Sequence, residues 1–87
     1  MIFDTQSYTV NNNVLTKNQY NLLKLLTDAK YKVVTYDTII QKIWPETCTT
    51  MINVRALICQ VRKKVGKDAI KTYGFIGISI VVPITVI

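Results

Sequence analysis

Basic residues gather in one segment of the sequence, between Arg55 and Lys71. This segment holds six Lys and Arg side chains and one acid, Asp68, in a chain whose formal net charge is +6 at neutral pH. Clustered cations attract polyanions such as nucleic acids, and neutral amides beside them can bind base edges. The cluster therefore favours a nucleic-acid partner, although excess basic residues also serve solubility.

The basic segment overlaps a predicted helix with two contrasting faces. At about 100° per residue, one set of aliphatic side chains points within about 40° of a single direction and predicts a buried face. That set comprises Val54, Ile58, Val61 and Val65, with Leu57 at its flank. The opposite face is centred on Ile52, Ala56, Cys59 and Lys63, and it is bordered by Asn53, Gln60 and Lys64 on one side and by Arg55 and Arg62 on the other.

This second face suits contact with duplex DNA. Arg, Asn and Gln side chains can make bidentate hydrogen bonds to base edges in the major groove, and Ala can meet a thymine methyl group. Arg62, Lys63 and Lys64 are expected to reach phosphates. The alternative is a solvated basic face, because charge runs often are no more than that. An outward Ile52 counts against this alternative, since adjacent exposed apolar residues are more typical of a surface that binds a partner.

The sequence offers few groups for catalysis or metal binding. It has no histidine, only Ser7 and Ser79 as serines, and five scattered carboxylates without a pair. Cys48 and Cys59 stand eleven positions apart without a CxxC spacing, so no zinc site is expected and free thiols are favoured over a disulfide. No phosphate-binding glycine loop is present. We expect no enzyme activity, no cofactor, no metal and no small-molecule ligand.

The first half of the chain predicts short strands followed by two helices. Asparagines 11–13 tolerate the left-handed conformation of tight turns, and the residues around them predict antiparallel strands at 2–4, 7–10 and 14–15. Thr16 and Gln19 have the chemistry of a capping box, and a helix with one apolar face follows over residues 17–29. An extended segment at 32–35 precedes a second helix, which begins at residue 35 or 36 and which Pro45 stops.

The second half predicts a third helix and a hairpin. Thr49 or Thr50 is the N-cap of the third helix, which ends near Gly66. Residues 69–73 and 78–82 flank a turn with two glycines and predict a β-hairpin. The chain is then one domain over residues 1–87, with strands in 1–16, helices in 17–66, and the hairpin with an apolar tail in 67–87.

The apolar tail is predicted to be extended. Residues 78–87 are about half as long as a membrane helix and include Pro83. Because Ile84, Val86 and Ile87 are too apolar for water, we expect them to pair with the N-terminal strands or with a second copy of the chain. No signal-peptide pattern opens the sequence, so we expect a cytoplasmic protein, or the cytoplasmic part of a membrane-tethered regulator if the chain is a fragment.

Motifs spread over nearly the whole chain match one known arrangement. They are Leu15-Thr16, Leu22-Leu23 and Leu25-Leu26 for a first helix, Val33-Val34-Thr35, Ile40 and Ile43-Trp44 for a second, Asn53, Ile58 and Val61 through Gly66 for a third, and Ile70-Lys71-Thr72 with Gly77 for a wing. In this order and spacing they resemble the OmpR/PhoB-type winged-helix effector domain, in the receiver-less form of the ToxR and CadC kind. The resemblance implies an α+β winged helix-turn-helix with a four-stranded N-terminal sheet, three helices and a C-terminal hairpin.

The resemblance also implies a function. It is sequence-specific binding of double-stranded DNA by a bacterial transcription regulator, with the third helix in the major groove and the wing near the minor groove or the backbone. The residues carried over from the family are Asn53, Arg55, Ala56, Gln60, Arg62 and Thr72, and the expected set of DNA-binding residues also includes Thr50, Lys63, Lys64 and Lys71. The loop between Pro45 and Thr49 is expected to contact RNA polymerase, and the domain is expected to act as a homodimer on DNA or with a partner subunit.

Two features depart from the family pattern. The wing turn has no cation, since Gly74, Phe75 and Ile76 stand where relatives carry an arginine or another polar residue. This raises an alternative function, a winged helix that binds a partner protein through its apolar wing and tail. No receiver domain precedes the helices in this sequence, so control is expected from abundance, a partner or a membrane-linked segment rather than from aspartyl phosphorylation within the chain.

Overall fold

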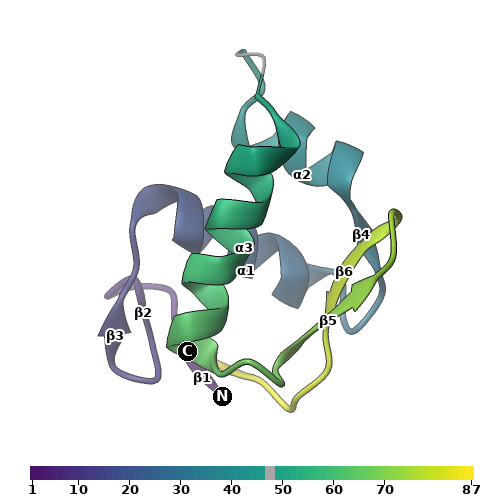
Figure 1. The fold of residues 1–87 in the computed structure, drawn as a ribbon. Coiled ribbons are helices and arrows are strands. Elements are labelled where there is room, and N and C mark those ends of the chain that lie inside the picture. Colours follow the sequence, from purple (N-terminus) through teal and green to yellow (C-terminus); the bar gives the residue numbers. More distant parts are fainter. Residues whose placement is uncertain (47–48) are drawn as a thin grey trace.

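The computed structural model describes residues 1–46 and 49–87, and within them three helices lie between two small sheets (Figure 1). In chain order the elements are β1 (Ile2–Asp4), β2 (Thr9–Val10), β3 (Asn13–Val14), α1 (Lys17–Asp28), β4 (Val34–Thr35), α2 (Tyr36–Ile43), α3 (Met51–Val65), β5 (Ile70–Tyr73), β6 (Gly77–Ile80) and β7 (Thr85–Val86). This order confirms the predicted α+β winged-helix class. Figure 1 shows α3, in green, between the β2–β3 pair and the hairpin of β5 and β6.

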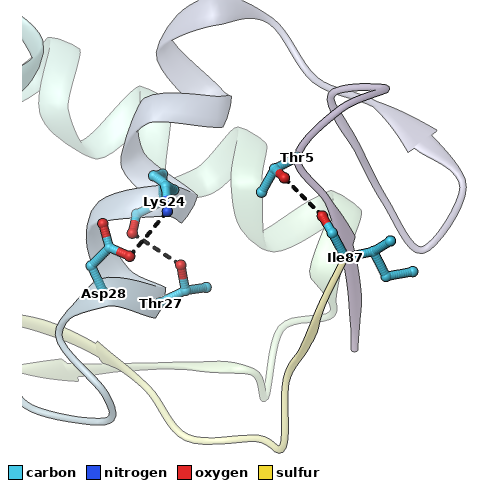
Figure 2. A network of polar contacts seen from close by, with 5 residues as sticks. All are labelled: Thr5, Lys24, Thr27, Asp28 and Ile87. Atoms are coloured by element: carbon cyan, nitrogen blue, oxygen red, sulfur yellow. Dashed lines mark hydrogen bonds and ion pairs between the residues drawn. The ribbon is translucent and has the colours of Figure 1, made fainter.

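The N-terminal sheet has the strand order β3-β2-β1-β7. Strands β1, β2 and β3 pair antiparallel, whereas β7 joins β1 in parallel with Phe3 opposite Val86. The hydroxyl and the backbone N–H of Thr5 both donate to the backbone oxygen of Ile87, at 2.7 and 3.1 Å (Figure 2). The apolar tail therefore pairs with the N-terminal sheet, the first of its two predicted partners.

One predicted strand is shorter than expected. The segment proposed at residues 7–10 begins only at Thr9, because the residues before it form a turn. Asp4 Oδ1 accepts hydrogen bonds from the backbone N–H groups of Gln6 and Ser7 at 3.0 and 3.2 Å, and Tyr8 has a φ of 55°. An aspartate that accepts from the amides two and three residues ahead favours a turn over a strand.

Helix α1 begins with the predicted capping box. The Gln19 N–H donates to the Thr16 hydroxyl at 3.3 Å, and the Thr16 N–H donates to Gln19 Oε1 at 3.1 Å. On the exposed side of the last turns, Lys24 pairs with Asp28 at 3.2 Å, and the Thr27 hydroxyl donates to the Lys24 carbonyl at 2.9 Å (Figure 2). The helix ends at Asp28, one residue earlier than predicted.

The core lies where all three helices meet both sheets. Its fully buried side chains are Phe3 and Val10 from the N-terminal sheet, Leu22, Leu23 and Leu26 from α1, Ile39 from α2, Val54 and Val61 from α3, and Ile78, Ser79 and Ile80 from β6. On α3, Leu57 and Ile58 are also buried and Val65 is half-buried. The predicted packed face of the third helix is confirmed, and this fixes which face of α3 remains outside.

The wing is the predicted hairpin with a third strand added. Its strand order is β4-β6-β5, and both pairings are antiparallel. Strand β6 ends at Ile80, two residues before the predicted end, and Val81 and Val82 lead out of the sheet toward Pro83. Gly77 is required where β6 passes β4, because a Cβ there would lie 2.0 Å from the Val34 carbonyl oxygen.

Candidate nucleic-acid interface

The outward face of α3 has the composition that the helical pattern predicts. Its exposed residues are Ile52, Asn53, Arg55, Ala56, Cys59, Gln60 and Lys63, and Ile52 is 76% exposed. The helix is fixed in this rotation by the buried face of Val54, Leu57, Ile58 and Val61 on its other side. Polar, basic and small side chains therefore share one surface over about three turns of helix.

At the N-terminal end of α3, two predicted site residues hold the first turn. Thr50 is the N-cap, and its backbone carbonyl accepts from the N–H groups of Asn53 and Val54 at 3.1 and 3.3 Å. The Asn53 amide donates to the Thr49 hydroxyl at 3.0 Å. Thr47 and Cys48 lie outside the described residues, and so do the predictions about the Cys48 thiol and the middle of that loop. Cys59 is a free, exposed thiol.

On one border of the face, Gln60 and Lys64 bind α1 and the N-terminal sheet. The Lys64 ammonium donates to Gln19 Oε1 at 2.6 Å and to the Val14 carbonyl, and Gln19 Nε2 donates to Gln60 Oε1 at 3.0 Å. The Lys64 side chain, which was expected at a phosphate, is therefore engaged within the chain and half-buried.

On the other border, Arg62 joins α3 to the wing. Its guanidinium donates to the Thr72 hydroxyl and to the Ile70 carbonyl, the latter at 3.3 Å. Lys71, beside Thr72 on β5, holds its ammonium 5.1 Å from the centre of the Tyr73 ring, within cation–π range. The structure thus brings two predicted site residues, Arg62 and Thr72, together, and leaves Arg55, Lys63 and Lys71 free of ion pairs among the described residues.

A hollow lies on each flank of α3. The larger one has a volume of about 600 Å³ and separates α3 from the wing, with Arg55, Cys59, Arg62, Thr72 and Phe75 among its lining residues. The smaller one, about 220 Å³, lies toward the start of α1 and is lined by Thr16, Asn18, Asn53, Ala56 and Gln60 among others. Helix α3 therefore forms a ridge between two depressions, and most of the predicted site residues line one or the other.

Sequence reasoning missed the part that Gln19 and Asn13 play beside this surface. The sequence placed Gln19 in the capping box and on the packed face of the first helix, yet its side chain also contacts both Gln60 and Lys64. The Asn13 amide nitrogen lies 3.5 Å from the Lys64 carbonyl oxygen. A polar residue on the packed face at the start of a helix indicates that its side chain has hydrogen-bond partners. Identifying those partners requires knowing how α1 packs against α3.

Within residues 1–46 and 49–87, no group of three or more His, Cys, Asp or Glu side chains could hold a metal ion. No helix in them combines the length and the apolar character needed to cross a bilayer.

The chain is similar to proteins of known family and fold. Residues 11–78 match the family model described as transcriptional regulatory protein, C terminal. The transcriptional regulatory protein KdpE of Staphylococcus aureus is 36% identical over 84 residues, an alignment that covers 86% of this chain and 36% of that protein. The chain thus spans little more than a third of that relative.

Two solved structures share the fold. The DNA-binding domain of Bacillus subtilis CssR is 22% identical, with 84% of this chain and 88% of that chain covered and a TM-score of 0.72. The DNA-binding domain of E. coli CadC is also 22% identical, with 86% and 78% covered and a TM-score of 0.75. Both similarities establish the winged-helix arrangement of strands, helices and hairpin described above.

Proposed function

The chain belongs to the family of C-terminal domains of transcriptional regulatory proteins, and from this premise we propose that it binds double-stranded DNA through α3 and thereby regulates transcription. The observation that carries the proposal is the ridge formed by the exposed face of α3. A major groove about 12 Å wide admits one α-helix. The ridge presents Arg55, Ala56 and Gln60 along its length with a hollow on each side, and these hollows leave room for the walls of the groove.

The proposed contacts divide into two roles. Arg55, Ala56 and Gln60 face outward near the middle of α3 and are assigned to base edges, with Asn53 one turn earlier. Exposed Lys63 at the end of the helix and exposed Lys71 on β5 are assigned to phosphates. Arg62 and Thr72 bind each other. Their proposed role is to hold the wing against α3 and to contact the DNA backbone together.

The wing contributes little charge to this interface. Its tip carries Phe75, which is 94% exposed, and Ile76, which is 64% exposed. We assign the attraction to DNA mainly to α3, Lys67 and Lys71. The exposed tip favours a second candidate function, docking on a partner protein, because large apolar side chains in water mark interaction sites more often than phosphate contacts.

Two further contacts stay predictions that follow from the family. One is binding of RNA polymerase by the loop between Pro45 and Thr49. The other is a homodimer or a partner subunit on adjacent half-sites, whose separation would be one helical turn or a multiple of it.

The test is binding of the folded domain to a random pool of duplexes at increasing salt. Affinity should fall steeply, since each neutralised phosphate contributes about 0.9 to the slope of log K against log salt. Lys63→Ala should weaken binding to all sequences and lower that slope by about 1, whereas Arg55→Ala should relax preference at one base position at a cost of about 1 to 3 kcal/mol. Lys32→Ala removes the same charge outside α3 and the wing, so it serves as the matched control.

Two results would count against the proposal. A folded domain that binds no duplex at low salt would exclude DNA binding. A Lys63→Ala variant with altered base preference, beside an Arg55→Ala variant with none, would show that the assignment of bases and phosphates to these residues is wrong.

A further inference from the structure

Three hydrogen bonds converge on the side-chain amide of Gln19, which is 5% exposed. Its Oε1 accepts from the Thr16 backbone N–H at 3.1 Å and from the Lys64 ammonium at 2.6 Å. Its Nε2 donates to Gln60 Oε1 at 3.0 Å. Gln19 therefore connects the cap of α1 to two residues on the border of the exposed α3 face.

The chemistry of its partners fixes which way the Gln19 amide points. A backbone N–H and an ammonium group are donors only, so the atom between them must be the amide oxygen, whose two lone pairs they fill. Turning the amide over would place an NH₂ group against two donors, so that the Thr16 N–H and the Gln19 amide would both lose their hydrogen bonds, which is costly. The Gln19 nitrogen must therefore face Gln60.

The orientation of Gln60 follows from that of Gln19. Because Gln19 presents an N–H, Gln60 must present its oxygen inward. Among the residues that the structure describes, the Gln60 nitrogen has no hydrogen-bond partner, and the residue is exposed on the outer face of α3. A free glutamine can bind adenine with one donor and one acceptor, but here the Gln60 oxygen is turned inward to accept from Gln19.

We propose that Gln19 is a positioning residue for DNA recognition, which holds Gln60 so that α3 presents only N–H donors at that point of the groove. This inference rests on the proposed function. The base that fits is guanine, whose N7 and O6 both accept hydrogen bonds in the major groove, while cytosine offers only a donor there. In this proposal the buried Gln19 makes no contact with DNA, yet it determines whether Gln60 offers a hydrogen-bond donor or an acceptor to the base.

Gln19→Glu is the substitution that reverses this choice with little effect on the fold. Glutamate keeps both acceptor bonds, to the Thr16 N–H and to Lys64, and it suits the third position of a capping box as well as glutamine does. It cannot donate to Gln60. The Gln60 amide is then expected to turn over, give its NH₂ to the new carboxylate, and present its oxygen outward.

The first experiment selects bound duplexes from a random pool with the wild-type chain, Gln19→Glu and Gln19→Met. The wild type should favour guanine at one position by about five- to tenfold, the lower end of the range for one good base contact. Gln19→Glu should favour cytosine or adenine at that position only, since their exocyclic amines are donors, and Gln19→Met should lose the preference there. Gln41→Glu adds the same charge on exposed α2 and should leave every preference unchanged.

The second experiment observes the Gln60 side-chain amide by NMR in the free protein. Its NH₂ resonances should shift markedly in Gln19→Glu, where they acquire a carboxylate acceptor, and only slightly in Gln41→Glu. Unchanged Gln60 resonances in Gln19→Glu would overturn the inference without reference to DNA.

The two ideas fail in different ways. If the wild type selects a motif that Gln19→Glu retains at every position, the positioning role of Gln19 is refuted and DNA binding stands. If the folded wild-type chain selects no duplex, DNA binding is refuted and the positioning role falls with it.

Discussion

A methyl group at Gly77 should disrupt the wing sheet. A Cβ built there lies 2.0 Å from the Val34 carbonyl oxygen and 2.8 Å from the Thr35 Cα, both of them backbone atoms of β4. To restore the separation of at least 3.0 Å that Cβ atoms keep, β4 must move by about 1 Å relative to β6. Since Gly77 is paired with Thr35 in the sheet, the displacement acts directly on the β4–β6 ladder.

The cost can be worked from the bonds that this displacement stretches. The Tyr36 N–H donates to the Ile76 carbonyl at 3.1 Å, and a further 1 Å exceeds any useful hydrogen-bond length. Each lost bond costs about 0.5 to 1.5 kcal/mol, and overpacking alone costs about 1 to 3 kcal/mol. We expect Gly77→Ala to lower the free energy of unfolding by about 2 to 4 kcal/mol.

Gly74→Ala is the matched control in the same turn. Gly74 has a φ of +54°, and no atom lies within 4 Å of its added Cβ. The substitution therefore adds only the cost of a left-handed alanine, about 1 kcal/mol. The two glycines differ in the reason for their presence, steric contact at one and backbone conformation at the other.

Urea unfolding, followed by circular dichroism and by Trp44 fluorescence, would measure both effects. With a slope near 1 kcal/mol per molar urea, the midpoint should fall by about 2 to 4 M for Gly77→Ala and by about 1 M for Gly74→Ala. If Gly77→Ala proves no more destabilising than Gly74→Ala, the close approach of β4 and β6 is wrong.

Three further predictions concern other contacts. Thr72→Val removes one of the two acceptors of the Arg62 guanidinium. It should cost about 1 to 2 kcal/mol of unfolding free energy, because hydrogen bonds to charged groups are strong but the exposure of Thr72 to water reduces the loss; unchanged stability would mean that the pair contributes nothing. The Ser7 hydroxyl, with the backbone N–H groups of Ser7 and Gln6, holds the pKa of Asp4 below its ordinary value. The ionised Asp4 therefore stabilises the folded state above about pH 4, and this contribution is lost as the pH falls through the lowered pKa. Asp4→Asn should flatten the thermal stability profile across that window, and a profile that keeps the wild-type shape would contradict the prediction. A chain cut after Val82 loses the pairing of β7 with β1 and should sediment as an unchanged monomer with a lower unfolding midpoint, while a change from dimer to monomer would show that the tail joins two chains.

The elements and the buried face of α3 could be predicted because hydrophobic spacing determines them locally. Val54, Ile58 and Val61 lie on one side of any helix that contains them, whatever surrounds it, and the structure buries all three. The Thr16–Gln19 capping box is equally local. The turn at Asp4 was missed since strand propensity in residues 7–10 competes with a side-chain hydrogen bond that the pattern of hydrophobic residues does not contain.

The partners of the polar site residues could not be predicted in this way. A helical wheel gives the direction in which Lys64 leaves α3, but a long side chain can turn back, and here it meets Val14 and Gln19, 50 and 45 positions earlier in the chain. The same holds for Arg62, which crosses to Thr72 on β5. Such contacts depend on how α1 and the wing pack against α3, so the sequence identifies candidates for DNA contact without separating free cations from engaged ones.

The parallel pairing of β1 with β7 has a consequence for synthesis on the ribosome. Strand β1 pairs with β2 within the first ten residues, but the other edge of β1 pairs only with Thr85 and Val86, which are synthesised much later. At about 5 to 20 residues per second, this edge stays uncovered for roughly 4 to 15 s in the nascent chain. Uncovered strand edges are sites of mispairing between chains. Expression at a high level should therefore favour aggregation through β1. A chaperone that binds the nascent chain and covers this strand should raise the yield of folded protein.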